Sequence, residues 1–477
     1  MVSIDIEHSS GLPEGIFSLL DTDLYKLTMQ CAVLLYFPLV EVTYSFTNRT
    51  PLMKFSRVAF RWLEVQIAKL ANLSLSEDEF RWLKSMCPYL GPSYLEYLAN
   101  FKFEPSRQLD VSFELENDTG DDDDIGEIHI GVRGLWVETI LYEIPLLALT
   151  SEAYFRFRDR DWSHEGQEAK AYAKGKTLLQ HGCMFSEFGT RRRRDYHTQD
   201  LVIRGLSRAA ADGGEKGWRG KLVGTSNVHL AMKHGIAPIG TVAHEWFMGI
   251  AAITNNYMSA SETALRYWVG CFGEGVLSVA LTDTFGTPAF LESFRKSMPV
   301  LSSNTPGDAA TPVEKRAKSR TYAQIFTGVR QDSGDPSDFI KVMRKFYNRE
   351  GIKEKKTIVF SDSLDIERCL KYKQEAEEAG FLASFGIGTF FTNDFTHASS
   401  NERSAPLNIV IKLSSAAAHH AVKISDNIGK NTGDRDTVES VKETLGYVEK
   451  CWKGGDESVR LGAACNPDSQ NANRFSG

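Results

Sequence analysis

The sequence contains no CxxC pair, no HExxH motif, no P-loop and no long apolar run. Its seven cysteines are scattered, which argues against a disulfide framework or a zinc ribbon and favours reduced thiols inside a cell. The missing apolar run excludes a membrane-spanning helix, and the N-terminal residues lack the pattern of a secretory signal. We therefore expect a cytoplasmic protein, with a nuclear pool left open, that does not bind membranes.

The sequence also has no excess of positive charge. The net charge is −7, so no nucleic-acid partner is expected, and an anionic ligand would need a local basic site. The chain has 477 residues, of which 42% are hydrophobic and 25% charged. This length predicts two to three domains, or one large barrel with a companion domain.

A change of pattern near residue 182 divides the chain. Before it, helical and strand patterns are mixed. After it, short apolar runs end in small or polar residues and are followed by helical segments, seven times: CMFSEFGTR, KLVGTSN, PIGTVAHE, VLSVALTDT, TGVRQDSGD, TIVFSDS and LASFGIGT. This alternation predicts a parallel sheet. Seven units favour an irregular TIM-like α/β barrel, with a doubly wound sheet left open; in both, ligands bind at the carboxyl ends of the strands.

The expected domains follow from this division. We expect an α/β companion domain over residues 1–150 and the barrel over 151–405. A C-terminal segment, 406–453, is predicted to pack on the companion domain, and residues 454–477 to form a frayed tail. Residues 298–321 are rich in Ser, Thr, Pro and Ala, and we predict a mobile insertion there.

Two of the strand ends carry charged clusters. EFGTRRRRD places Phe188 before four arginines, beginning with Arg191; a solvated basic turn explains any single arginine, whereas a guanidinium fork at a strand end suits phosphate or carboxylate. In GVRQDSGDP, helix capping before Pro336 explains a serine or an aspartate but leaves Arg330 and Asp332 unexplained. Both clusters are therefore candidate binding sites.

Two further strand ends are typical of ribose and phosphate sites. In FSDSLD, Asp362 can accept hydrogen bonds from ribose hydroxyls. In FGIGT, Gly386 and Gly388 let the backbone approach a phosphate, and Thr389 adds a hydroxyl and an amide. Each motif alone is weak, because the last glycine of the dinucleotide fingerprint is missing.

The segment GTVAHEWFMG leaves several roles open for His244. Met248 stands where a zincin would have its second histidine, so no metal ligands are expected in the protein. A helix start capped by Thr241 or His244, with Trp246 and Phe247 in the core, is the structural alternative. The position at a predicted strand end favours acid–base work or a nucleophile toward phosphorus.

These motifs, together with TDLYKLTMQ, TYSFTNR, GTSNVHLA and LTDTFGT, occur in an order that resembles the nicotinate phosphoribosyltransferases, in their fungal form. The resemblance implies synthesis of nicotinate mononucleotide and pyrophosphate from nicotinate and phosphoribosyl pyrophosphate. It also implies coupling to ATP hydrolysis, Mg²⁺ as the accompanying ion, and a homodimer with shared active sites.

The resemblance also assigns roles to single residues. His244 corresponds to the histidine that ATP phosphorylates, and Asp332 and Glu245 are placed beside it as candidate catalytic residues. Tyr25, reaching across the dimer interface, and Phe188 are expected on the two faces of the pyridine ring. The other substrate contacts expected are Arg330 and Thr241 for the carboxylate, Asp362 for ribose, Gly386, Gly388 and Thr389 for the 5′-phosphate, and Arg191, Arg49 and Lys412 for phosphates.

Ser226 bears on the choice of base. The related family that uses nicotinamide has an aspartate there, which would repel a carboxylate, so serine favours nicotinic acid. The alternatives are a nicotinamide or quinolinate phosphoribosyltransferase and a nucleotide-sensing protein without turnover. The effect of the insertion at 298–321 on the site is left open.

Overall fold

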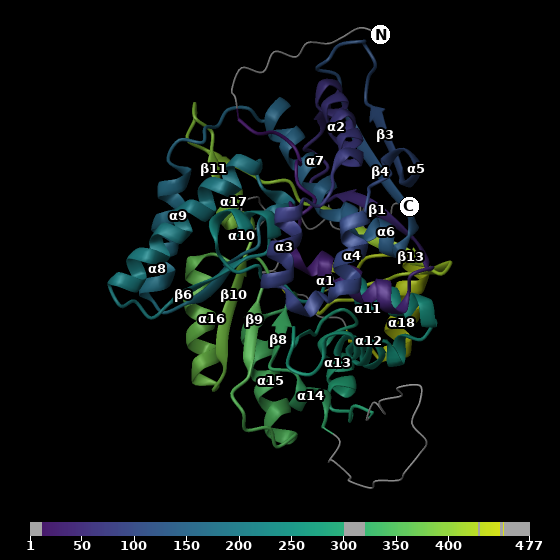
Figure 1. The fold of residues 1–477 in the computed structure, drawn as a ribbon, viewed down its shortest axis with the longest axis vertical. Helices are drawn as coiled ribbons and strands as arrows, with labels where there is room; N and C mark the ends of the chain where they lie inside the picture. Colours follow the sequence, from purple (N-terminus) through teal and green to yellow (C-terminus); the bar gives the residue numbers. More distant parts are fainter. Residues whose placement is uncertain (1–11, 300–319, 428–429, 449–451, 453–477) are drawn as a thin grey trace.

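The computed structural model describes residues 12–299, 320–427, 430–448 and 452. It contains two large β-sheets, one antiparallel and one parallel, with helices around both (Figure 1). The predicted tail, 454–477, and most of the predicted insertion lie outside the described residues. The two ends of that insertion are held together, because the Met298 amide donates to the Arg320 carbonyl at 2.9 Å.

The antiparallel sheet combines N-terminal and C-terminal strands in the order β14-β13-β1-β4-β2, with β3 also paired to β4. Its strands are β1 Glu41–Asn48, β2 Phe55–Ser56, β3 Leu109–Leu115, β4 Ile125–Leu135, β13 Ile409–Ala416 and β14 His419–His420. Buried and exposed residues alternate along β4, as expected for a sheet with one covered face. Because β1 pairs with β13, the C-terminal region contributes a strand to the antiparallel sheet.

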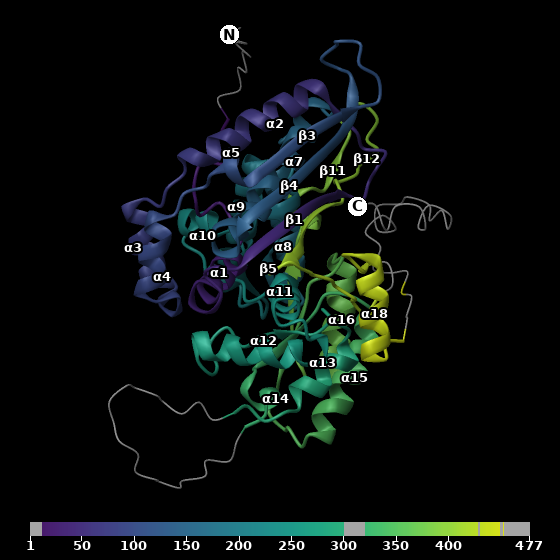
Figure 2. The same cartoon turned by 90° about the vertical axis from the view of Figure 1, so that its right-hand side faces the viewer.

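Helices cover this sheet, and in Figure 2 α2 runs beside the long strands β3 and β4. The helices of the N-terminal half are α1 Leu24–Tyr36, α2 Arg57–Lys69, α3 Glu77–Met86, α4 Pro92–Asn100, α5 Pro105–Gln108, α6 Trp136–Thr139 and α7 Glu143–Phe157. The acidic run 121–124 lies in the β3–β4 hairpin loop. Arg57 and Arg61 pair with aspartates of that loop, which reduces the repulsion among them.

The second sheet is parallel, with the order β6-β5-β10-β9-β8-β7. Its strands are β5 Met184–Glu187, β6 Lys221–Thr225, β7 Val279–Leu281, β8 Gly328–Gln331, β9 Thr357–Phe360 and β10 Leu382–Ile387. Six of the seven predicted strands are confirmed, but PIGTVAHE is not one of them. Only an isolated bridge between Thr225 and Pro238 forms there, through the Ala237 carbonyl and the Ile239 amide. Within the described residues no ladder joins β7 to β6, so closure of the barrel stays a prediction.

Most of the helices after residue 160 alternate with the strands of the parallel sheet. They are α8 Gln167–Gln180, α9 Tyr196–Glu215, α10 Val228–His234, α11 His244–Thr254, α12 Tyr257–Phe272, α13 Thr287–Phe294, α14 Tyr322–Ile325, α15 Pro336–Arg349, α16 Ile366–Glu378, α17 Thr389–Thr392 and α18 Arg435–Leu445. A short pair, β11 Phe395–Thr396 and β12 Arg403–Ser404, lies apart from both sheets. Helix α15 starts as predicted, with Asp335 as N-cap and Pro336 in the first turn.

One buried hydrophobic cluster extends through both sheets. Trp136 of α6 and Trp246 of α11 lie in it with their ring centroids 6.0 Å apart, which ties the helix that carries His244 to the companion domain. Burying a large side chain of this kind contributes roughly 1.5–3 kcal/mol. One predicted core residue is wrong: Val342 of α15 is 40% exposed, because the buried stripe passes through Phe339, Met343 and Phe346.

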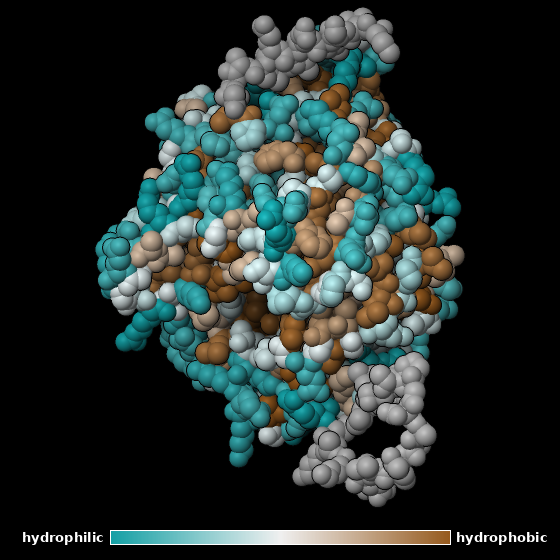
Figure 3. Space-filling model, in the orientation of Figure 1, coloured by the Kyte–Doolittle hydropathy of each residue, from teal (hydrophilic) through white to brown (hydrophobic). Residues whose placement is uncertain are grey.

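The surface in Figure 3 mixes hydrophilic and hydrophobic residues, and hydrophobic ones gather in a band across the middle of that face. Within the described residues, no helix is both long enough and apolar enough to cross a membrane.

Candidate active site

His244 is the first residue of α11, and its ring is held at both nitrogens. Nδ1 lies 3.0 Å from the Thr284 hydroxyl, and Nε2 lies 3.0 Å from a carboxylate oxygen of Asp332. The Lys423 ammonium donates to Nε2 at 2.9 Å. The imidazole is 5% exposed. A structural histidine in a core needs one hydrogen-bond partner at each nitrogen. Nε2 of His244 has two, the Asp332 carboxylate and the Lys423 ammonium.

Three loops at one edge of the parallel sheet supply these partners. Thr284 follows β7, Asp332 follows β8, and Ser361 follows β9 and donates to the second oxygen of Asp332 at 2.6 Å. The loops meet because the carboxyl ends of parallel strands share an edge. Lys423 comes from the C-terminal segment, after the antiparallel sheet, so the histidine lies where the two sheets' connections converge.

The electrostatics keep His244 neutral. Burial, together with the charge of Lys423, lowers the pKa of His244 to about 4. Burial opposes ionisation of Asp332, but Arg330 and His244 outweigh it and hold the pKa of Asp332 well below its usual value. At neutral pH, Nε2 therefore has a partner in both tautomers of the neutral ring. Without a proton, Nε2 accepts from Lys423; with a proton, it donates to Asp332.

A group of cations faces the same region. Arg191 lies in the 3-10 turn Thr190–Arg192 after β5, and Lys412 lies on β13. Burial lowers the pKa of Lys412 to about 7, with Arg191, Lys423 and Arg49 adding to the effect; the carboxylate of Glu143 opposes it. Several cations gathered around one carboxylate keep a net positive charge, which is typical of a site for a polyanionic ligand.

The four-arginine run divides into two pairs. Arg193 and Arg194 are fully buried. Arg193 forms a bidentate pair with Asp21 at 2.8 Å, and Arg194 lies 3.7 Å from the ring centre of Phe155. Arg193 and Arg194 therefore stabilise the fold. Of the four arginines, Arg191 and Arg192 are the two that can join Arg49 and Lys412 in the cation group.

The loop 240–243 brings three predicted residues together. The Thr28 hydroxyl donates to the Thr241 carbonyl at 2.6 Å, and Arg330 donates to the Val242 carbonyl at 3.1 Å. A side chain at Gly240 would come within 2.9 Å of the Tyr25 amide, so the loop packs directly on the start of α1. Thr241 does not cap α11, whose N-cap is Ala243 without a side-chain bond. Tyr25, Thr241 and Arg330 thus converge within one chain.

Phe188 lies on the backbone of the neighbouring strand. Its amide donates to the Ile387 carbonyl at 2.7 Å, and a Cβ built on Gly386 would be 2.3 Å from two ring carbons of Phe188. The glycine therefore seats the aromatic ring. Gly388 approaches the Phe188 carbonyl, and Thr389 starts the short helix α17 beside it.

A first prediction follows for Gly386→Ala. The added methyl group must displace the Phe188 ring, and a lost aromatic stacking contact costs about 0.5–1.5 kcal/mol. We expect the KM of a planar aromatic substrate to rise by up to about tenfold, with a smaller change in kcat. Steady-state kinetics check this, with Gly214→Ala, where a Cβ meets nothing within 4 Å, as the control. An unchanged KM in Gly386→Ala would show that the ring makes no substrate contact.

Ser226 is buried beside a carboxyl group. Its hydroxyl donates to Asp23 at 2.7 Å. Burial raises the pKa of Asp23 above its ordinary value. An aspartate at position 226 would place a second buried acid against Asp23, so the serine avoids repulsion within the protein as well as toward a ligand carboxylate.

Asp362 lies at the end of β9, next to the C-terminal segment. Its carboxylate pairs with Lys430 at 2.6 Å, and Lys430 also donates to the Asp332 carbonyl at 3.1 Å. The C-terminal segment thus contributes two lysines, Lys423 and Lys430, to this region. The sequence pattern did not indicate either one, although KISDNIGK carries both in one short stretch.

Glu245 points away from the histidine partners. Its carboxylate accepts from the Tyr44 hydroxyl at 2.6 Å, from the Trp136 indole at 2.8 Å and from Lys26. None of these three touches the His244 ring. The geometry therefore gives Glu245 a place in a buried ion network, and a catalytic role for it stays a prediction.

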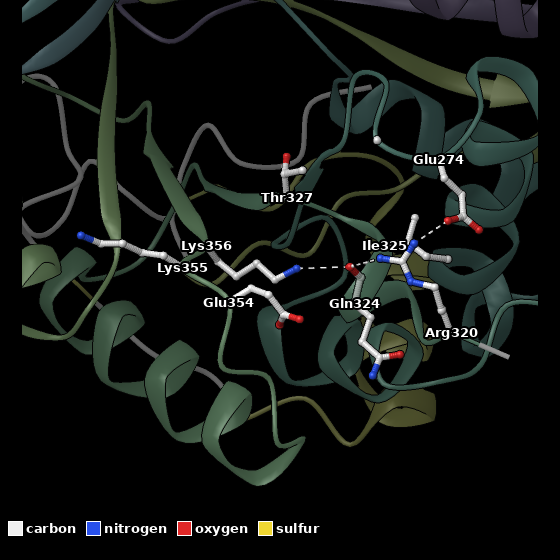
Figure 4. A pocket seen from close by; sticks show the side chains of 9 residues that line it. Glu274, Arg320, Gln324, Ile325, Thr327, Glu354, Lys355 and Lys356 are labelled. Atoms are coloured by element: carbon white, nitrogen blue, oxygen red, sulfur yellow. Dashed lines mark hydrogen bonds and ion pairs between the residues drawn. The ribbon is translucent and has the colours of Figure 1, made fainter. Parts of the chain in front are cut away.

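A separate pocket of about 350 Å³ lies at the opposite edge of the parallel sheet (Figure 4). Thr327 and Lys356, which precede β8 and β9, line it, and Lys356 donates to the Phe326 carbonyl at 2.7 Å. Arg320 pairs with Glu274 at its rim. This pocket lies apart from the groups around His244, which are at the carboxyl ends of the strands.

The fold and the site define an α/β enzyme that brings a neutral buried histidine and a group of cations to the carboxyl ends of a parallel sheet. Sequence profiles agree in detail. The nicotinate phosphoribosyltransferase (NAPRTase) family matches residues 183–449, and the NAPRTase N-terminal domain matches residues 20–151. The chain belongs to the nicotinate phosphoribosyltransferase family.

Two fungal relatives are similar over most of their length. A probable nicotinate phosphoribosyltransferase of Schizosaccharomyces pombe is 47% identical over 90% of this chain and 98% of its own. The nicotinate phosphoribosyltransferase of Saccharomyces cerevisiae is 45% identical over 93% of this chain and 98% of its own. The crystal structure of a putative nicotinate phosphoribosyltransferase from Saccharomyces cerevisiae superimposes with a TM-score of 0.82 and 44% identity, covering 92% of this chain and all of that one. The resemblance drawn from the motifs is confirmed.

Proposed function

We propose that this enzyme converts nicotinate and phosphoribosyl pyrophosphate into nicotinate mononucleotide and pyrophosphate, the first step of NAD salvage from nicotinate. ATP hydrolysis to ADP and phosphate accompanies the reaction. The observation that carries the choice of an acidic base is the position of Arg330. Its guanidinium is largely buried, and its Nε finds no hydrogen-bond acceptor in the described part of the chain. A ligand carboxylate would satisfy this donor, beside the loop that carries Thr241.

The ribose and its phosphates fit the adjoining groups. In this proposal Asp362 contacts the ribose hydroxyls, and the backbone at Gly386, Gly388 and Thr389 binds the 5′-phosphate. Arg191, Lys412 and Arg49 receive the pyrophosphate. Glycosyl transfer develops positive charge on the sugar and negative charge on the leaving pyrophosphate, so these cations stabilise the transition state without a covalent bond to the protein.

His244 is the proposed site of phosphorylation by ATP. In the tautomer with its proton on Nδ1, the ring donates to Thr284, and the lone pair of Nε2 attacks once Lys423 turns its proton toward the phosphate. The Nε2–P bond forms as the bond from the γ-phosphorus to the bridging oxygen breaks, and the electron pair leaves with ADP. Water later cleaves the N–P bond and releases phosphate. Lys423, at 2.9 Å from Nε2, is placed to neutralise the transferred phosphoryl group.

Mg²⁺ is proposed to arrive with the phosphates of the substrates. Across the described residues, no set of three or more His, Cys, Asp or Glu side chains is arranged to hold a metal alone. One carboxylate oxygen of Asp283 is buried without a hydrogen bond and lies 4.0 Å from Nε2 of His244. Asp283 and Asp332 therefore suit a cation that takes its remaining ligands from phosphate and water. Such an ion neutralises phosphate charge.

A homodimer with shared active sites is part of this proposal. Two large apolar side chains at the end of α1 support it, because Leu35 is 58% and Leu39 82% exposed. In the single chain, the charges of Glu143 and Arg191 already act on the Tyr25 hydroxyl. Measurement of the molar mass in solution, and activity on mixing inactive Tyr25 and His244 variants, test whether sites are shared.

Location in the cytoplasm, with or without a nuclear pool, stays a prediction.

The function is tested by pyrophosphate release with three bases. We expect release with nicotinate and phosphoribosyl pyrophosphate, and far less with nicotinamide or quinolinate at equal concentration. A clear preference for nicotinamide would overturn the argument from Ser226 and Arg330. Binding of phosphoribosyl pyrophosphate without any release would favour a nucleotide-sensing protein.

A second prediction concerns pH. Lys412 has a pKa of about 7 in the free enzyme, so it loses its charge as the pH rises above 7. A bound anion raises that pKa, and binding then takes up a proton. We therefore expect the affinity for pyrophosphate to fall by up to tenfold per pH unit above pH 7. Calorimetric titration from pH 6 to pH 9 measures this. In Lys412→Met the slope should be smaller, and an equal slope would assign it to another group.

A further inference from the structure

A single buried carboxylate, Glu143, joins the cation group to the rest of the protein. It is the first residue of α7, and its side chain is 7% exposed. Its two oxygens face in different directions. Oε2 lies 2.6 Å from the Lys26 ammonium, and Oε1 lies 3.8 Å from Arg191 and 4.0 Å from Lys412.

The Oε2 side is a fixed anchor. Lys26 is fully buried and also pairs with Glu245, whose carboxylate is held in turn by Tyr44 and Trp136. Helices α1, α6, α7 and α11 and strand β1 all contribute to this network. The partners in a buried ion network stay together, because separating one of them leaves another buried charge uncompensated.

Oε1 attracts Arg191 and Lys412 by charge but accepts no hydrogen bond from either side chain. Separations of 3.8 Å and 4.0 Å are too long for hydrogen bonds, yet short enough for strong attraction in a partly buried site. Within the described residues, neither Arg191 nor Lys412 donates a side-chain hydrogen bond. Arg193 differs in this respect, because Asp21 occupies its fork at 2.8 Å. Arg191 and Lys412 thus keep their donors for an anionic ligand.

We infer that Glu143 is a positioning residue of the active site, which holds Arg191 and Lys412 in place and charged while leaving their hydrogen-bond donors to the ligand. The inference rests on the proposed function only for the identity of the natural anion. Burial opposes ionisation of Glu143, but Lys26, Lys412 and Arg191 hold its pKa at about 2, so its charge is present throughout the working range of pH.

The electrostatic effect can be separated from packing. In the described part of the chain, the charged groups that act most on Lys412 are Glu143 on α7, Arg191 after β5, Arg49 after β1 and Lys423 in the C-terminal segment. Of these four, Glu143 favours the charged lysine. Without that carboxylate, Lys412 should lose its proton at a lower pH. Glutamine at 143 preserves the size of the side chain and can still accept from Lys26, so it removes mainly the charge.

The test is calorimetric binding of inorganic pyrophosphate to the full chain from pH 5.5 to pH 9, with wild type and Glu143→Gln. We expect roughly tenfold weaker binding at pH 7 for each pKa unit that Lys412 loses, and the fall in affinity should begin at a lower pH. In the background Lys412→Met, Glu143→Gln should leave the pH at which affinity falls unchanged. Glu143→Asp, which keeps the charge, should recover part of the affinity.

Glu152→Gln is the control for replacing a buried carboxyl group; burial raises the pKa of Glu152 to about 8, so this control tests packing. Glu152 is a buried carboxyl on the same helix, but it faces the Gly15 amide and Arg156, away from the cation group. It should bind pyrophosphate as wild type does. Equal affinity and equal pH dependence of wild type and Glu143→Gln would overturn the inference while leaving the proposed function standing. Absence of pyrophosphate binding in wild type would overturn both. Should Glu143→Gln not fold, a pH profile of Glu143→Asp identical to wild type at equal affinity would count against the role.

Discussion

We expect the replacement of His244 with asparagine to abolish acid-labile labelling of the protein by γ-labelled ATP. In the proposed mechanism the label is a phosphoryl group on Nε2, and the asparagine amide has no lone pair of comparable nucleophilicity at that position. ATP-dependent acceleration of pyrophosphate release should be lost with the label. Removing a positioned catalytic side chain usually costs about 10²–10⁴-fold in rate, and a loss in this range is expected for ATP-driven turnover.

His181→Asn is the control for this experiment, because His181 is exposed at the end of α8 and contacts only a backbone carbonyl of its own helix. It should be labelled as wild type is. Label that persists in His244→Asn would show that another residue carries the phosphoryl group. The pH dependence adds a check. His244 has a pKa of about 4, so labelling should stay constant from pH 8 down to about pH 5 and fall only below that.

Replacing Arg330 with leucine should raise the KM for nicotinate more than any other single change at the base-binding end. The guanidinium is largely buried, and its Nε has no acceptor in the described part of the chain. Losing a charge-assisted pair with a carboxylate costs about 1.5–3 kcal/mol, which corresponds to roughly 10- to 150-fold in KM. Because nicotinamide has no carboxylate, its weak binding should change little, and the preference for the acid should shrink by the same factor.

Two comparison variants make this interpretable. Arg330→Lys keeps the positive charge but not the planar fork, so it should recover only part of the affinity. Arg349→Leu removes an exposed arginine at the end of α15 and should change neither the KM for nicotinate nor the KM for nicotinamide. Equal losses for nicotinate and nicotinamide in Arg330→Leu would mean that the arginine supports the loop at Val242 rather than the substrate carboxylate.

Much of the parallel half could be predicted from local pattern. Short apolar runs ending in polar residues indicated six of its strands, and the polar groups at their ends do converge, as His244, Thr284 and Asp332 show. The prediction for the segment before His244 failed because its apolar residues suggested a strand, whereas the folded segment forms an isolated bridge. Val342 failed for a related reason, since helical spacing identifies a stripe but not its edges.

Contacts between distant segments could not be predicted from pattern. Lys423 reaches Nε2 from 179 positions away, and Glu143 meets Arg191 and Lys412 from three separate parts of the chain. The four arginines looked equivalent in sequence, yet Arg193 and Arg194 are buried in the fold. Which members of a charged run face a ligand depends on the turn that carries them, and only the folded chain defines that turn.

The most direct test of the account is pyrophosphate release from phosphoribosyl pyrophosphate with nicotinate, measured with and without ATP. We predict release that depends on nicotinate and is clearly faster with ATP, with ADP and phosphate formed in the same reaction. Release that ATP does not change, with no ADP formed, would contradict the phosphohistidine mechanism. No release with nicotinate under either condition would contradict the proposed reaction itself.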